Sequence, residues 1–116
     1  MADVSKETEQ QVLEFQQAQN QLQMIVMQKG QVRMQVEELE GALEELKKAS
    51  GKVYKSTGAI LLESNKDSLA KELAEKKETM LVRSQVLGKQ EEKLRSKLME
   101  LKGKIEAATK GMKGAG

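Results

Sequence analysis

The acidic side chains are the residues of this chain best suited to catalysis, because the sequence contains no His and no Cys. The commonest general base and the thiolate nucleophile are therefore missing. Carboxylates stand close together at Glu37–Glu38, Glu40–Glu44 and Glu91–Glu92. Such pairs perform acid–base chemistry or bind metal ions where a pocket encloses them. The surrounding sequence predicts no pocket and contains no G-x-x-x-x-G-K-[ST] motif for phosphate binding. We therefore expect solvated helix faces and predict no enzyme, no metal site and no cofactor.

The composition favours long helices over a compact globule. The chain has 116 residues and a mass of 12.9 kDa; 33% of the residues are charged, 2% are aromatic, and the mean hydropathy is -0.61. A chain this polar is disordered unless its apolar residues share one face. Here they recur at regular spacing, which is typical of long amphipathic helices.

Charge pattern and hydropathy limit the classes of partner. The 20 basic and 18 acidic residues are interspersed and leave a net charge of +2, so neither a basic patch nor an aromatic stacking platform for nucleic acid is predicted. The opening stretch MADVSKETEQ lacks the apolar core of a signal peptide, and no apolar run approaches the ~20 residues that span a bilayer. We expect a soluble cytoplasmic protein that binds neither nucleic acid nor membrane.

Apolar residues follow a heptad pattern in two segments, about residues 5–49 and about residues 66–110, and each segment is predicted to be one helix. The apolar a and d positions of the first segment include Phe15, Ala18, Leu22, Ile25, Val32, Val36, Leu39, Leu43 and Leu46. Those of the second include Ala70, Leu73, Met80, Leu87, Leu94, Leu98, Leu101 and Ile105. One antiparallel register matches both seams along their length and places Leu43 opposite Leu73.

The predicted fold is therefore dominated by helix: a long antiparallel two-helix coiled coil in a single domain over residues 1–116, with a disordered tail at residues 111–116. Acidic residues precede lysines by four positions on the exposed faces, as at Glu44–Lys48, Glu72–Lys76 and Glu100–Lys104. Each such pair adds roughly 0.2–0.5 kcal/mol to the helix.

The segment between the helices, KVYKSTGAILLES at about residues 52–64, has the β-branched and long apolar residues typical of strands. Val53–Ser56 and Ala59–Glu63 are predicted to pair around Thr57–Gly58, where Gly58 supplies a positive φ. An isolated hairpin is marginally stable and leaves open edges that recruit other strands. We therefore expect the hairpin to be an oligomerisation site that joins an intersubunit β-barrel. The residues that define this site are Val53, Tyr54, Gly58, Ile60, Leu61 and Leu62, and the apolar side chains among them, including Val53, are expected to be exposed in the single chain. The alternative is a plain connector, which needs no cluster of large apolar side chains.

A second apolar set lies at the end of the coil opposite the hairpin. Val12 and Leu13 fall outside the heptad stripe, next to Phe15. The last turns of a two-helix coil fray, and flexible apolar side chains repack around segments of no fixed shape. The residues predicted to contact unfolded proteins are Val12, Leu13, Phe15, Leu101, Ile105, Ala108 and Met112. The alternative is that they only close the coil; for Phe15, Leu101 and Ile105 both roles are expected, whereas contact with a client is favoured for Val12 and Leu13.

Three methionines, Met24, Met27 and Met34, lie on the outer flank of the first helix. They are interpreted as gap fillers at a partly buried edge, an ordinary role of methionine. The alternative is that they line a side of the helix that faces a cavity.

Two stretches carry a resemblance to a known family. They are VYKSTGAILLESNKDSLAKELAEKKE at residues 53–78, with V-Y-K before the turn and K-D at the start of the second helix, and LVRSQVLGKQEEKLRSKLMEL at residues 81–101. Together with the layout of one hairpin between two coiled-coil helices, they resemble the β-class prefoldin subunits of archaea over about residues 5–110. The α subunits of that family carry two hairpins, and this sequence has room for one.

The resemblance implies a hexamer of two α and four β subunits, in which the hairpins build a double β-barrel and six coiled coils surround an open cavity. It implies an ATP-independent molecular chaperone, a holdase that captures unfolded proteins at the coiled-coil tips and delivers them to a group II chaperonin. The implied partners are prefoldin α subunits, other β copies, unfolded clients and the chaperonin.

Two other functions fit parts of the sequence. A structural coiled-coil tether would use the hairpin for oligomerisation and the helices as spacers, without affinity for unfolded chains. A surface amphipathic helix would bind membranes, but two apolar stripes that already match each other argue against it.

Overall fold

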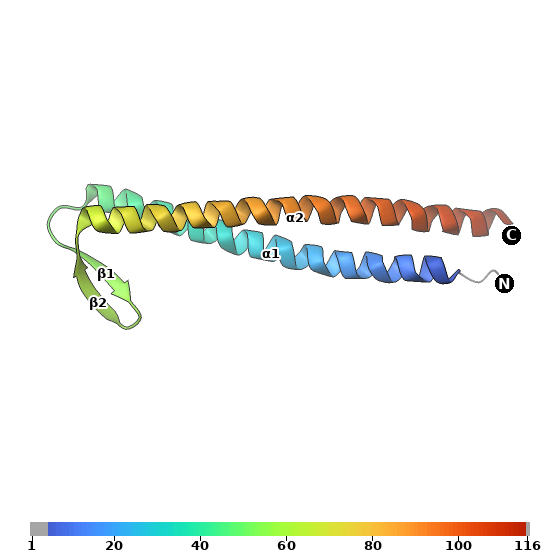
Figure 1. Cartoon of the computed structure of the whole chain (residues 1–116), viewed down its shortest axis with the longest axis horizontal. Coiled ribbons are helices and arrows are strands. Elements are labelled where there is room, and N and C mark those ends of the chain that lie inside the picture. Colours follow the sequence, from blue (N-terminus) through green and yellow to red (C-terminus); the bar gives the residue numbers. More distant parts are fainter. Residues whose placement is uncertain (1–4, 116) are drawn as a thin grey trace. The chain divides into compact units, whose positions relative to one another are not determined.

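The chain folds into a long helix, a β-hairpin and a second long helix, in that order. The computed structural model describes the backbone of residues 5–115 and the side chains of residues 5–111. The elements are α1 (Lys6–Lys48), β1 (Val53–Thr57), β2 (Ile60–Ser64) and α2 (Lys66–Ala115) (Figure 1).

The chain divides into two compact units, and each helix contributes a segment to both. The terminal unit contains residues up to 28 and residues from 87 onward, and the hairpin unit contains residues 29–86. Within each unit the α1 and α2 segments run antiparallel (Figure 1). The single domain over residues 1–116 stays a prediction.

Side chains and backbone chemistry fix where α1 begins and ends. Ser5 is its N-cap, because the Ser5 hydroxyl accepts a hydrogen bond from the backbone N–H of Thr8 at 3.1 Å. After the last turn Gly51 adopts a φ of +85°, which a residue with a side chain rarely does. The Lys66 ammonium donates to the carbonyl oxygens of Lys47 at 3.2 Å and Ala49 at 3.0 Å, so a residue of α2 satisfies acceptors at the end of α1.

Asn65 starts α2. Its side-chain oxygen accepts hydrogen bonds from the backbone N–H groups of Asp67 at 2.8 Å and Ser68 at 3.1 Å, the pattern of an N-cap. The helix continues to Ala115, beyond the predicted end near residue 110. The residues after 110 include glycines, which weaken a helix, but no proline, which would end it. Side chains beyond residue 111 lie outside the described residues, so the disordered tail stays a prediction.

The predicted heptad seam is confirmed by burial. Every predicted a and d position from Thr8 to Ala108 is buried or half-buried. The buried seam residues include Ala18, Leu87 and Leu101 in the terminal unit and Val32, Val36 and Leu46 in the hairpin unit. An ion pair at 3.6 Å between Lys77 and Glu40 crosses from α2 to α1 within the hairpin unit. The apolar stripes of the two helices therefore bury each other within each unit.

The hairpin is antiparallel, with Val53 opposite Ser64 and Thr57 opposite Ile60. The predicted turn at Thr57–Gly58 is displaced by one residue, because Thr57 ends β1 and the loop consists of Gly58 and Ala59. Gly58 has a φ of +60°, and no described residue other than glycine has a positive φ. Glycine in the first loop position followed by a residue of negative φ is typical of a type II′ turn, so alanine fits the second position.

Candidate functional site

The hairpin exposes a group of large apolar side chains. Because cross-strand partners share a face and successive residues alternate, Leu62 and Ile60 lie on the face of Val53, whereas Tyr54 and Leu61 lie on the opposite face. The side chains of Tyr54, Ile60, Leu61 and Leu62 are all exposed, and that of Leu61 is 70% exposed. We call Tyr54, Ile60, Leu61 and Leu62 the hairpin surface. Its apolar side chains therefore occupy both faces of a two-stranded sheet.

Val53 differs from the other predicted residues of the hairpin. The expectation that the hairpin exposes Val53 is wrong, because its side chain is only 8% exposed and packs with Leu46 and Leu69. Burial of a valine side chain contributes roughly 1.5–3 kcal/mol. Val53 therefore anchors the start of β1 to the ends of both helices, while the rest of the hairpin stays accessible.

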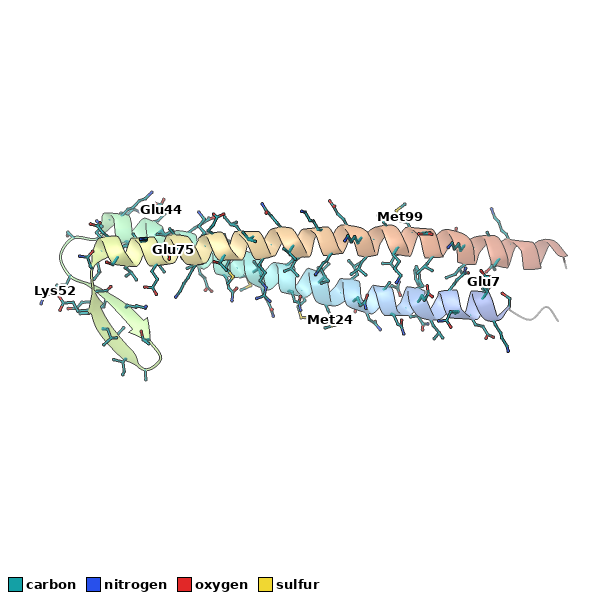
Figure 2. All side chains as sticks on the ribbon, in the orientation of Figure 1. Glu7, Met24, Glu44, Lys52, Glu75 and Met99 are labelled. Atoms are coloured by element: carbon teal, nitrogen blue, oxygen red, sulfur yellow. The ribbon has the colours of Figure 1, made fainter. Side chains whose placement is uncertain are left out.

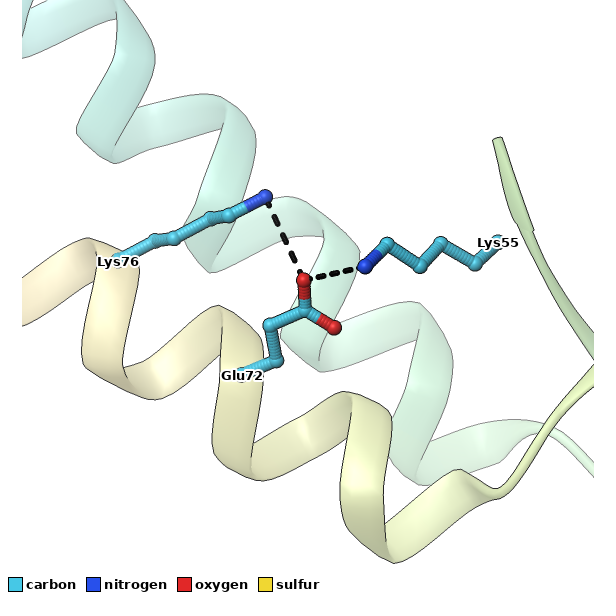
Figure 3. Close-up of polar contacts among 3 residues, drawn as sticks. All are labelled: Lys55, Glu72 and Lys76. Carbon is cyan, nitrogen blue, oxygen red and sulfur yellow. Dashed lines mark hydrogen bonds and ion pairs between the residues drawn. The ribbon is translucent and has the colours of Figure 1, made fainter. Parts of the chain in front are cut away.

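A carboxylate on α2 also holds β1, through a lysine two residues after Val53 on the same face of the hairpin. Lys55 on β1 donates a hydrogen bond to Glu72 Oε1 at 2.5 Å, and Lys76 Nζ lies 3.7 Å from the same oxygen (Figure 3). The hydrogen bond from Lys55 lowers the pKa of Glu72 below its ordinary value, and the charges of Lys55 and Lys76 act in the same direction. The predicted Glu72–Lys76 pair is confirmed; its extension to the hairpin was not predicted.

An open cleft of about 550 Å³ lies between the hairpin and the helix ends. Its apolar lining includes Leu46, Val53 and Leu73, and its charged lining includes Glu72 and Lys52. Figure 2 shows Lys52 projecting from the connection before β1. Tyr54 of the hairpin surface and the anchored residue Val53 both line this cleft.

The terminal unit contains the residues predicted to meet unfolded proteins. Leu13 is 54% exposed and Val12 is also exposed, as expected for positions outside the seam. Leu101 is buried, so it belongs to the seam. The half-buried residues of the set are Phe15, Ile105 and Ala108. The side chain of Met112 lies outside the described residues. The role of all seven in binding stays a prediction.

Sequence reasoning missed several exposed apolar side chains. The gap-filling role assigned to Met24, Met27 and Met34 is wrong, because all three are more exposed than buried. They occupy c and f positions of the heptad, outside the a and d positions that the opposite helix buries. Further exposed apolar residues outside the a and d positions are Val26, Leu81, Val82, Val86 and Met99. Their exposure could have been predicted from the sequence, because none of these residues occupies an a or d position of the heptad.

Within residues 5–111, no three acidic side chains come together in a way that could hold a metal ion. Neither described helix contains a stretch long and apolar enough to cross a bilayer.

Comparison with known proteins gives a consistent set of relatives. The family model of a prefoldin subunit matches residues 9–111. The prefoldin subunit beta of Archaeoglobus fulgidus is 40% identical over 108 residues, which cover 91% of this chain and 93% of that protein. The prefoldin subunit beta of Pyrococcus furiosus is 33% identical over 92 residues, 78% of this chain and 79% of the relative.

A solved structure agrees with this assignment. The crystal structure of the prefoldin beta subunit from Thermococcus strain KS-1 superposes with a TM-score of 0.85 and 34% sequence identity, covering 93% of this chain and 96% of that one. The resemblance inferred from residues 53–78 and 81–101 is thereby confirmed, as is the fold of two long helices with a central hairpin. Prefoldin subunits are chaperones rather than enzymes, and they assemble with other prefoldin subunits. This chain belongs to the prefoldin family.

Proposed function

We propose that this chain is a β-type subunit of a cytoplasmic, ATP-independent holdase. In this proposal four copies assemble with two α-type prefoldin subunits through their hairpins. The assembly captures unfolded proteins at the helix ends of the terminal units and passes them to a group II chaperonin. The observation that carries the proposal is the hairpin surface, whose large apolar side chains are exposed on both faces of a two-stranded sheet.

The energetics of the hairpin support assembly. A two-stranded sheet has an unpaired edge on each strand, and such edges pair with strands from other chains. Each large apolar side chain that moves from water into an interface contributes up to roughly 1.5–3 kcal/mol. Residues on both faces gain this energy only if the sheet becomes part of a closed or layered structure, as the strands of a barrel do.

The chemistry of the helix ends supports capture of clients. Leu13 is exposed outside the seam, and the seam residues beside it have neighbours on one side only once the last turns fray. Contacts of this kind are weak and unspecific when taken singly. Several copies in one assembly bind the same unfolded chain with avidity, because later contacts form at high effective concentration. Release then needs no ATP, since a chaperonin competes for the same apolar segments.

Light scattering of a denatured test protein tests the proposal. The protein is diluted from denaturant with this chain alone, with an α-type prefoldin subunit alone, and with both together. The proposal predicts that the mixture suppresses aggregation at a few complexes per client and that suppression does not change when ATP is added. If the chain is a structural tether, the same complex forms but aggregation is not suppressed. That result would refute the holdase function and favour the tether.

A further inference from the structure

A shallow, open groove lies in the terminal unit between the segments of α1 and α2, away from the helix ends. Its volume is about 370 Å³. The seam residues Ile25 and Leu94 form its apolar floor, and Met24 stands on the side of α1. Met24 is 61% exposed, so a thioether side chain and part of the apolar seam are open to solvent at one place.

The α1 side of this groove is free of charge. Residues 15–28, FQQAQNQLQMIVMQ, contain no Asp, Glu, Lys or Arg, in a chain of which 33% of residues are charged. The polar lining from α1 consists of the amides of Gln21 and Gln28, and α2 adds the amide of Gln90. Each amide both donates and accepts hydrogen bonds. An extended polypeptide carries unpaired backbone N–H and C=O groups that these amides can satisfy.

The one charged side chain among the described residues that line the groove comes from α2 and is basic. Lys93 lines the groove, and Lys89 and Lys97 stand four residues before and after it, on the same stripe of the helix. All three are exposed. No carboxylate lines the groove. Residues 89–97 of α2 carry four basic residues against two carboxylates, Glu91 and Glu92, so the field beside the groove favours an acidic or neutral partner over a basic one.

We propose that this groove is a second binding site, separate from the helix ends, for an extended apolar segment of an unfolded polypeptide with acidic flanks. The proposal rests on the proposed holdase function and adds a preference in sequence to it. Met24 adapts to side chains of different shape, the glutamines meet the backbone, and the lysine row attracts the flanking carboxylates. A compact small ligand fits poorly, because an open groove leaves most of it in water.

The test measures peptide binding to the assembled complex of the full chain with an α-type subunit. The probes are two fluorescent peptides with the same apolar decamer, one flanked by glutamates and the other by lysines, followed by anisotropy. We expect tighter binding of the glutamate-flanked peptide. Met24→Lys should weaken it about tenfold, the loss expected when one methionine no longer buries its side chain. Lys93→Glu should reverse the preference between the two peptides.

Met99→Lys is the matched control. Met99 belongs to the same unit, is 76% exposed and does not line the groove; Figure 2 shows Met24 and Met99 projecting toward opposite sides of the helix pair. Its substitution should change affinity less than twofold, and Met24→Gln, which adds no charge, should weaken binding in the direction of Met24→Lys. Equal effects of Met24→Lys and Met99→Lys on peptide affinity, or no effect of either, would refute the proposed binding site in the groove.

Two further readouts separate this proposal from the holdase itself. Aggregation suppression by the unsubstituted complex together with unchanged peptide binding by Met24→Lys would refute the groove and leave the holdase intact. Groove-dependent peptide binding without suppression would refute the holdase and leave the groove. A change in the mass of the complex caused by Met24→Lys would assign this face to contact between copies and would also refute the groove.

Discussion

Lys55 on β1 and Glu72 on α2 form an ion pair, with Lys55 Nζ 2.5 Å from Glu72 Oε1, that joins the hairpin to the second helix. Some ion pairs, such as that of Glu100 with Lys104 at 3.3 Å, lie within one helix, and the pair of Lys77 with Glu40 at 3.6 Å joins the two helices. The Lys55–Glu72 pair instead connects two elements whose relative direction no local pattern fixes. Together with the buried Val53 side chain, it sets how the hairpin leaves the helices.

We predict that Glu72→Gln loosens the hairpin from α2 in the isolated chain. The substitution removes the negative charge between Lys55 and Lys76, so β1 amides should exchange with solvent faster, and the difference should shrink at high salt because the pair is exposed. Hydrogen exchange measures this directly. Lys55→Met combined with Glu72→Gln should cost less than the sum of the two single changes. Glu100→Gln is the control, and strictly additive effects would contradict a direct pair.

Acid should loosen the hairpin through the same group. The Lys55 hydrogen bond holds the pKa of Glu72 below its ordinary value of 4.5. A carboxyl whose pKa is lower when folded stabilises the fold fully above its unfolded pKa, and this contribution is lost as pH falls through the folded pKa. Exchange of β1 amides should therefore rise relative to Glu72→Gln below about pH 4.5. Identical pH profiles for the two proteins would exclude a role for this carboxylate.

Two glycines should respond in opposite directions to alanine. Gly58→Ala places a side chain at a φ of +60°, which costs about 1–2 kcal/mol, so the free energy of unfolding should fall. Gly88 lies inside α2, and an added Cβ there meets no atom within 4 Å. Gly88→Ala should therefore raise the free energy of unfolding by about 1 kcal/mol. Urea denaturation followed by circular dichroism compares the two variants. A loss of stability in Gly88→Ala as well as in Gly58→Ala would contradict the open space found beside Gly88.

Client capture should depend on Val12 and Leu13 more than on other exposed apolar residues. Changing both to Ser in the assembled complex should reduce suppression of aggregation severalfold, because avidity multiplies the loss in each copy. Val82→Ser with Val86→Ser is the matched control, since these two side chains are also exposed but belong to the hairpin unit. Light scattering gives the comparison, and an equal loss in the two double variants would contradict binding at the helix ends.

The sequence predicted those features that depend on local periodicity. Burial repeats with the heptad along both helices, so the seam from Thr8 to Ala108 was correctly predicted. The turn was predicted to one residue, because Gly58 marks its start. The one-residue displacement arises because Ala59 occupies the second loop position with a negative φ, which many residues can adopt and no motif signals.

Features that depend on the direction of the hairpin were not predictable. The burial of Val53 and its contact with Leu46 and Leu69 require the strand to fold back over the helix ends. The Lys55–Glu72 pair joins residues 17 positions apart in different elements. Met24 is exposed because it stands at a c position outside the buried seam, whereas its hydrophobicity alone suggested partial burial.

Assembly through the hairpin surface is the central claim, and sedimentation of Leu61→Lys tests it most directly. Leu61 is 70% exposed in the single chain, so the substitution should leave the helicity of the isolated chain unchanged. We predict that the unsubstituted chain and an α-type subunit sediment as one hexameric complex, whereas Leu61→Lys stays dissociated and Met99→Lys assembles normally. A hexamer formed equally well by Leu61→Lys would contradict it.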